Sequence, residues 1–73
     1  MRVLVTGASG FIGLPLLRQL SEDGHEVLAL SRSVVSRREK NVLWLQCDLS
    51  LPESYSSQVS IFSPEILIHL AWQ

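Results

Sequence analysis

Three glycines spaced three residues apart constrain the fold of this chain more than any other feature of its sequence: Gly7, Gly10 and Gly13. They lie between an uninterrupted aliphatic run at residues 2–6 and an amphipathic segment at residues 11–23, where apolar side chains recur at helical spacing. There, Gly7 permits a sharp turn, Gly10 a close approach of the backbone to an anion, and Gly13 tight packing of a helix on a sheet. The pattern predicts a buried strand, an anion-binding turn and a helix. The alternative is a tight turn without a ligand.

The residues at the two ends of the predicted helix agree with its position. Pro15 falls in the first helical turn, where the N–H that it lacks has no intrahelical partner in any case. Gly24 follows the last helical residue and can adopt the left-handed conformation that ends many helices. The helix is therefore expected to stop at Asp23.

The rest of the chain alternates apolar runs with polar segments. Strands are predicted in three further apolar runs: a buried strand at residues 25–30, a third strand at 42–46 and a fourth at 65–70. The basic segment 31–41 is predicted to be a solvated loop with about two turns of helix, and the serine-rich segment 50–60 a loop with a weak helix at best. This order predicts the α/β class. Specifically, it indicates the N-terminal portion, about four strands, of a Rossmann-like doubly wound parallel sheet.

The composition excludes several classes of protein. A chain of 73 residues that is 47% hydrophobic, with a net charge of −1, is neither a disordered tail nor a nucleic-acid-binding arm. No apolar run reaches the ~18 residues of a membrane span and no signal peptide precedes the first strand, so a cytoplasmic location is expected. Cys47 is the single cysteine and is interpreted as a small buried hydrophobe. The sequence has no cluster of Cys and His, so no metal site is expected.

The run Thr6–Gly13, which reads Thr-Gly-Ala-Ser-Gly-Phe-Ile-Gly, resembles the fingerprint of the short-chain dehydrogenase/reductase superfamily. Its Gly-Phe-Ile-Gly ending is similar to the extended branch of that superfamily, the NAD-dependent epimerase/dehydratase family. Two later segments also resemble the family: Cys47-Asp48-Leu49 after the third strand, and Ile68-His69-Leu70-Ala71 at the end of the fourth. The resemblance implies the NAD(P)-binding part of a nucleotide-sugar epimerase, dehydratase or ketoreductase, which transfers a hydride between nicotinamide and a sugar carbon.

The resemblance also implies roles for particular residues. Asp48 and the backbone N–H of Leu49 would hold the adenine, unless Asp48 instead caps the following helix. Ala71 would let the ribose approach, while Trp72 departs from the small residue that the family commonly has there. His69 is interpreted as a core residue with a hydrogen-bonded ring. The expected cofactor-binding residues are Gly7, Ser9, Gly10, Phe11, Ile12, Gly13, Arg32, Asp48, Leu49, Leu70 and Ala71.

The end of the second predicted strand indicates which nicotinamide cofactor fits. NAD-dependent proteins hold the ribose 2′-hydroxyl there with an acidic residue, but this chain has Leu30-Ser31-Arg32-Ser33. Arg32 can pair with a 2′-phosphate, and a neighbouring serine can donate a hydrogen bond to it. The sequence therefore favours NADP over NAD. The alternative is that Arg32 only begins the solvated basic segment.

The family's catalytic Tyr-x-x-x-Lys is absent, because the only tyrosine, Tyr55, is followed four residues later by Val59. No catalytic residue is therefore expected in this chain, which is predicted to be inactive alone although its parent would be an enzyme. A domain this short also has a marginal core without disulfides or metals. We expect residues 1–73 to be a partial NAD(P)-binding Rossmann domain, with the substrate domain absent.

Two other functions remain open from the sequence. One is a reductase of the same superfamily that acts on a small ketone, and the other is a non-catalytic dinucleotide-binding sensor module. A homo-oligomer is expected, because a partner chain would cover the bare edge of a partial parallel sheet. Nucleic acid and membrane are not expected as partners.

Overall fold

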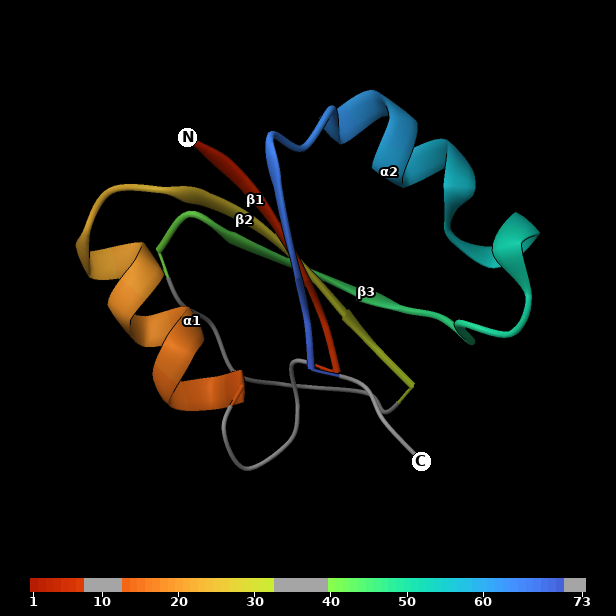
Figure 1. The fold of residues 1–73 in the computed structure, drawn as a ribbon, viewed down its shortest axis with the longest axis horizontal. Helices are drawn as coiled ribbons and strands as arrows, with labels where there is room; N and C mark the ends of the chain where they lie inside the picture. Colours follow the sequence, from red (N-terminus) through yellow and green to blue (C-terminus); the bar gives the residue numbers. More distant parts are fainter. Residues whose placement is uncertain (8–12, 33–39, 71–73) are drawn as a thin grey trace.

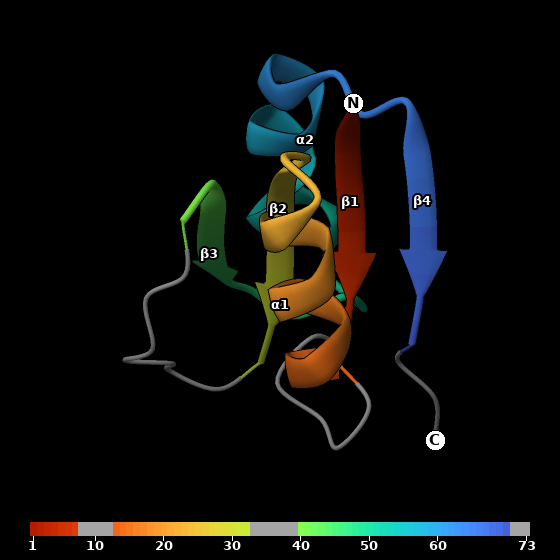
Figure 2. The ribbon, with the colours of Figure 1, turned by 90° about the vertical axis from the view of Figure 1, so that its left-hand side faces the viewer.

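The computed structural model describes residues 1–7, 13–32 and 40–70. Within these residues, four parallel strands form one sheet in the order β3-β2-β1-β4 (Figure 2). The strands are β1 (Arg2–Thr6), β2 (Glu26–Ser31), β3 (Val42–Gln46) and β4 (Ile66–His69). The helical elements are α1 (Gly13–Glu22), the short 3-10 helix η1 (Pro52–Ser54) and α2 (Ser56–Phe62). The predicted doubly wound parallel sheet is therefore confirmed, with β1 and β3 at their predicted bounds.

The helices α1 and α2 cover opposite faces of the sheet (Figure 1). Alternate residues of each strand point to opposite faces, so the sheet carries two separate apolar clusters. The α1-face cluster consists of the buried residues Val3, Val5, Leu17, Val27 and Ala29. The α2-face cluster consists of the buried residues Leu4, Leu28, Leu30 and Cys47. The strands β1 and β2 are covered on both faces, so apolar residues do not have to alternate with polar ones along them. This explains why both are uninterrupted aliphatic runs.

The C-terminus of α1 is closed by a Schellman arrangement around Gly24. Gly24 has a φ of 84°, its N–H donates to the carbonyl of Ser21 over 3.1 Å, and the N–H of His25 donates to the carbonyl of Leu20 over 3.1 Å. Two carbonyls that the helix cannot satisfy are thereby paired. The predicted role of Gly24 is confirmed, although α1 ends at Glu22, one residue earlier than expected.

The prediction for residues 50–60 is wrong. This segment holds η1 and the first part of α2, which is a regular helix that continues to Phe62. Tyr55, Val59 and Phe62 lie on one side of this region and pack against the α2-face cluster. Their spacing of four and three residues is a helical stripe, and burial of that stripe outweighs the poor helix propensity of the serines.

The strand β4 is the least covered of the four. Ile66 and Leu67 are 43% and 60% exposed, because β4 lies at one edge of the sheet. The fourth predicted strand is thus present, but it is shorter than residues 65–70 and does not have the burial of a central strand. Whether a partner chain covers this edge stays a prediction.

Three hydrogen bonds join the beginning of β1 to the residues that precede β4. The N–H of Arg2 donates to Oε1 of Glu65 over 2.9 Å, and the N–H of Glu65 donates to the carbonyl of Arg2 over 2.8 Å. The Nε of Arg2 also donates to the carbonyl of Ser63 over 2.9 Å. The N–H of Arg2, together with its positive side chain, holds the pKa of Glu65 below the ordinary value. We call these three residues the Arg2 clasp, and they fix where β4 begins beside β1.

Candidate functional site

The carboxyl ends of the four strands lie at the same edge of the sheet. This carboxyl edge is formed by residues 6–7, 31–32, 46–48 and 69–70, each of which ends or follows a strand. From β1, the chain crosses to β2 over the face that α1 covers, whereas β4 follows α2 on the opposite face (Figure 2). The strand order therefore reverses between β1 and β4, and ligands of open α/β sheets bind in the crevice at such a point.

Gly7, the residue directly after β1, has a backbone conformation that suits the predicted sharp turn. Gly7 has a φ of 69°, in the left-handed region that side-chain-bearing residues rarely adopt. Gly13 is buried and is the first residue of α1, whose first turn contains no acidic residue to offset the positive end of the helix dipole. Four other predicted contacts, Ser9, Gly10, Phe11 and Ile12, lie outside the described residues, as does Ala71.

Thr6 and His69 join β1 to β4 beside the crevice. The two residues are register partners, and the Thr6 hydroxyl shares a hydrogen bond of 2.5 Å with Nδ1 of His69. The N–H of Leu70 also donates to the carbonyl of Thr6 over 2.9 Å. The expected hydrogen bond of the His69 ring is confirmed, but its expected place in the core is wrong, because β4 is an edge strand and leaves His69 exposed.

Arg32 stands on the other side of β1, directly after β2. Its side chain is exposed, and its backbone carbonyl accepts a hydrogen bond of 3.3 Å from Nε2 of Gln46. The N–H of Cys47 donates to the carbonyl of Ser31 over 2.8 Å, which continues the β2–β3 pairing to this point. The ends of β2 and β3 are therefore held together, and the guanidinium of Arg32 lies at the carboxyl edge.

Asp48 follows β3 and forms a local turn with Ser50. Its Oδ1 accepts hydrogen bonds from the N–H of Ser50 over 2.9 Å and from the Ser50 hydroxyl over 2.7 Å. These two bonds, with a further contribution from the positive charge of Arg32, hold the pKa of Asp48 below its ordinary value. The alternative that Asp48 caps the following helix is wrong, since Leu51 precedes η1 and Tyr55 precedes α2, both without a side-chain cap.

Leu49, Leu70 and Tyr55 have packing roles at this edge. Leu49 packs against the α2-face cluster, and its carbonyl accepts a hydrogen bond of 3.3 Å from the Tyr55 hydroxyl. Leu70 packs against the α1-face cluster, on the opposite side of the sheet. Tyr55 thus has a structural role, because its ring packs against the α2-face cluster and its hydroxyl bonds the carbonyl of Leu49.

Cys47 is buried in the α2-face cluster, as expected for a small hydrophobe. Burial, and then the negative charge of Asp48, raise the pKa of its thiol. We expect iodoacetamide at pH 8 to alkylate the folded chain at least about tenfold more slowly than the chain in urea, because the thiolate is the nucleophile. Rates measured by mass spectrometry, with N-acetylcysteine as a solvent control, test this. Equal rates in the two solvents would contradict it.

Two polar residues at the carboxyl edge are absent from the sequence-based set: Gln46, which bonds the carbonyl of Arg32, and Ser50, which holds Asp48. The signal for Ser50 was available, because an Asp followed two residues later by a Ser is a frequent Asx turn. Gln46 carried no such signal, since its partner lies 14 residues away in sequence.

Within the described residues, no group of three or more His, Cys, Asp or Glu could hold a metal ion, and no helix is long and apolar enough to cross a membrane.

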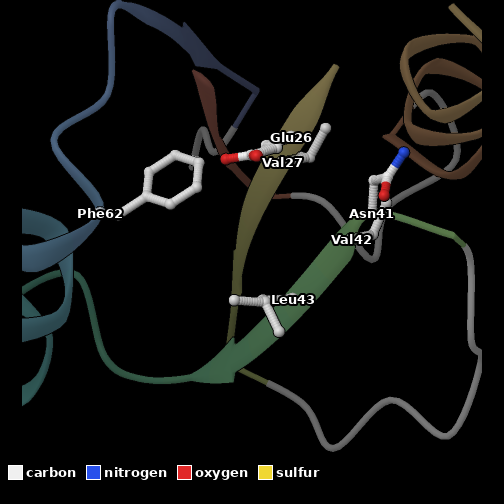
Figure 3. Close-up of a pocket in the computed structure, with 6 residues that line it drawn as sticks. All are labelled: Glu26, Val27, Asn41, Val42, Leu43 and Phe62. Atoms are coloured by element: carbon white, nitrogen blue, oxygen red, sulfur yellow. The ribbon is translucent and has the colours of Figure 1, made fainter. Parts of the chain in front are cut away.

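A cavity of about 320 Å³ lies near the amino ends of β2 and β3 (Figure 3). It is lined by Glu26, Val27, Asn41, Val42, Leu43 and Phe62. Figure 3 shows the ring of Phe62, from the end of α2, facing the carboxylate of Glu26. Since these strand residues lie at or near the amino ends of their strands, the cavity is distant from the carboxyl edge, and no residue expected to bind the cofactor lines it.

A glycine turn and a helix N-terminus at the reversal point of a parallel sheet define a doubly wound fold of the nucleotide-binding class. The model of the NAD dependent epimerase/dehydratase family matches residues 3–73, and the chain belongs to this family.

Individual relatives agree with this assignment. UDP-glucose 4-epimerase of Mycolicibacterium smegmatis is 35% identical, over 100% of this chain and 26% of its own length. A 3-diazoavenalumate denitrifying reductase of a Streptomyces species is 42% identical, over 94% of this chain and 22% of its own. The crystal structure of Thermus thermophilus UDP-glucose 4-epimerase in complex with NAD superposes with a TM-score of 0.85 at 36% identity, over 100% of this chain and 24% of that one. The chain therefore spans about a quarter of the length of these relatives.

Proposed function

We propose that this chain is the NAD(P)-binding part of a nucleotide-sugar epimerase, dehydratase or ketoreductase. The observation that carries the proposal is the left-handed Gly7, placed after β1 where the strand order reverses and followed by the helix α1, whose first turn holds no acidic residue. The similarity to a UDP-glucose 4-epimerase over the whole chain supports the choice of a sugar nucleotide as substrate. Catalysis is assigned to residues outside these 73, because Tyr55 lacks the lysine of the Tyr-x-x-x-Lys motif.

The described residues fit an extended dinucleotide laid across the carboxyl edge. The glycine run and the N-terminus of α1 would hold the pyrophosphate, since N–H groups and the helix dipole favour an anion there. Arg32, Asp48 and Leu49 would hold the adenosine end, and Leu70 and Ala71 would adjoin the nicotinamide end. When bound, the cofactor accepts or supplies a hydride. The role of this chain is to bind and orient the cofactor, with the nicotinamide end at the crevice beside β4.

NADP(H) is the preferred cofactor in this proposal. The position after β2 holds the exposed Arg32 instead of an acid, and within the described residues its guanidinium is committed to no ion pair. A 2′-phosphate gives such a guanidinium a bidentate partner. The Thermus thermophilus relative was crystallised with NAD, and the proposal for this chain rests instead on Arg32 at the position after β2.

A reductase that acts on a small ketone is the second candidate. It is favoured by the 58% identity, over 33 residues, to a 2-alkyl-3-oxoalkanoate reductase of Stenotrophomonas maltophilia. In both candidates, this chain holds the cofactor in the same way, because none of its residues is assigned to the substrate. Turnover of nucleotide sugars or of small ketones by the natural polypeptide that carries these residues separates the two. A cytoplasmic location and a homo-oligomeric state are part of both proposals.

The cofactor site is tested by replacing two left-handed glycines in parallel, Gly7→Ala and Gly24→Ala. Both have positive φ, so each variant should lose about 1–2 kcal/mol of stability. Only Gly7 lies at the carboxyl edge, so Gly7→Ala alone should also weaken NAD(P)H binding, by about tenfold or more in a fluorescence titration. Gly24 ends α1 and has open space around it, which makes Gly24→Ala a matched control for strain. Equal affinities of the two variants, or no binding by the unmodified protein, would refute the proposal.

A further inference from the structure

Arg32 and Asp48 form a pair of opposite charges across the ends of β2 and β3. Ser31 and Gln46 are register partners, and the chain continues by one residue to Arg32 on one strand and by two to Asp48 on the other. Arg32 contributes to the lowered pKa of Asp48, so the guanidinium acts electrostatically on the carboxylate. The two do not form an ion pair within the described part of the chain. Among residues 1–7, 13–32 and 40–70, the guanidinium therefore has no carboxylate bound to it.

The charge of Asp48 is held in place by its own turn. Both the N–H and the hydroxyl of Ser50 donate to the same oxygen, Oδ1. The backbone of Asp48 bonds to a different residue. Its N–H donates to the Ser54 hydroxyl over 3.3 Å, and its carbonyl accepts from that hydroxyl over 3.0 Å. The residue is thus bonded through its side chain and its backbone. The carboxylate of Asp48 is consequently a fixed negative charge near the guanidinium of Arg32, to which the proposed function assigns the 2′-phosphate.

We infer that Asp48 is a selectivity residue that opposes Arg32 and reduces the preference of the site for NADP(H) over NAD(H). The inference rests on the proposed function. The 2′-phosphate of NADP(H) carries almost two negative charges at neutral pH, and Asp48 repels it, whereas the neutral 2′-hydroxyl of NAD(H) is not repelled. This role differs from holding the adenine amine, because that hydrogen bond would serve both cofactors equally.

The variant Asp48→Asn isolates the charge. Asparagine can accept the same hydrogen bonds from Ser50, so the turn is retained while the negative charge is removed. In the natural polypeptide that carries these residues, we expect the ratio of NADPH affinity to NADH affinity to rise about three- to tenfold at pH 7.5 and low salt. Because the effect is electrostatic, most of it should disappear at about 1 M salt.

Two controls accompany this variant. Glu26→Gln removes the same charge at the amino end of β2, beside the cavity of Figure 3, and should leave the ratio of the two affinities unchanged. Ser50→Ala removes one hydrogen bond to Asp48 and keeps the carboxylate, so it too should leave the ratio unchanged.

The possible results separate the inference from the function on which it rests. An increase in the NADPH-to-NADH affinity ratio for Asp48→Asn alone, lost at high salt, supports the inference. An equal loss of both affinities would assign Asp48 to the adenine and overturn it, as would an unchanged ratio or an equal change in Glu26→Gln. Failure of the unmodified protein to bind either nucleotide overturns the proposed function, and the inference with it.

Discussion

Replacing Arg32 with aspartate is expected to reverse the cofactor preference of this protein from NADP(H) to NAD(H). The variant loses a charged partner for the 2′-phosphate, which is worth about 1.5–3 kcal/mol, so NADPH affinity should fall about 10- to 100-fold. The new carboxylate can accept a hydrogen bond from the ribose 2′-hydroxyl, so NADH affinity should rise. Arg32 is exposed, and its guanidinium has no hydrogen bond or ion pair within the described residues, so the fold should tolerate the change.

Fluorescence titration of NADPH and NADH measures both affinities in the same experiment. Arg18→Asp is the matched control, since Arg18 is an exposed arginine in the middle of α1 and its replacement changes the net charge equally. The control should lower NADPH affinity only slightly, through the general field of the protein. If Arg32→Asp leaves the preference unaltered, or if Arg18→Asp alters it as much, Arg32 only begins a solvated basic segment.

Truncation of Leu17 to alanine is expected to produce the largest loss of stability among single substitutions in α1. Leu17 is 0% exposed and is the side chain through which the helix enters the α1-face cluster. A buried Leu→Ala substitution costs about 2–5 kcal/mol through lost burial and the cavity that remains. Because a core of this size rarely supplies more than about 3–5 kcal/mol of stability, the variant should lose most of it.

Urea denaturation, followed by circular dichroism, gives the free energy of unfolding of each variant. Ile61→Ala in α2 is a suitable control, because Ile61 is 84% exposed and its truncation should change stability by no more than about 0.5 kcal/mol. Equal midpoints for Leu17→Ala and Ile61→Ala would mean that α1 is not anchored to the sheet by Leu17.

The elements that local sequence determines were predictable. The bounds of β1 and β3 follow from uninterrupted aliphatic runs, and the end of α1 follows from Gly24. The helix α2 was missed because its serines suggested a loop, while the stripe of Tyr55 and Val59 is recognisable only when the sheet face that it covers is known. The exposure of His69 depends in the same way on the edge position of β4, which is a property of the strand order.

The candidate site was predictable in its residue types and less so in its contacts. The glycine pattern and its place after a strand indicated a sharp turn at Gly7, and the structure gives this residue a φ of 69°. The neighbourhood of Arg32 and Asp48 was not apparent, since it requires β2 and β3 to pair in a particular register. The Thr6–His69 hydrogen bond spans 63 residues of sequence and likewise depends on the pairing of β1 with β4.

The Arg2 clasp implies a division of labour between the two ends of the sheet. At the amino ends of β1 and β4, a side chain and the backbone secure the pairing of two strands that are more than sixty residues apart, and no residue there is assigned to the cofactor. At the carboxyl ends, the exposed side chain of Arg32 and the turn of Asp48, to which we assign cofactor selectivity as a proposal, are not the main attachment of any strand. Substitutions that test selectivity there should therefore leave the pairing of β1 with β4 intact.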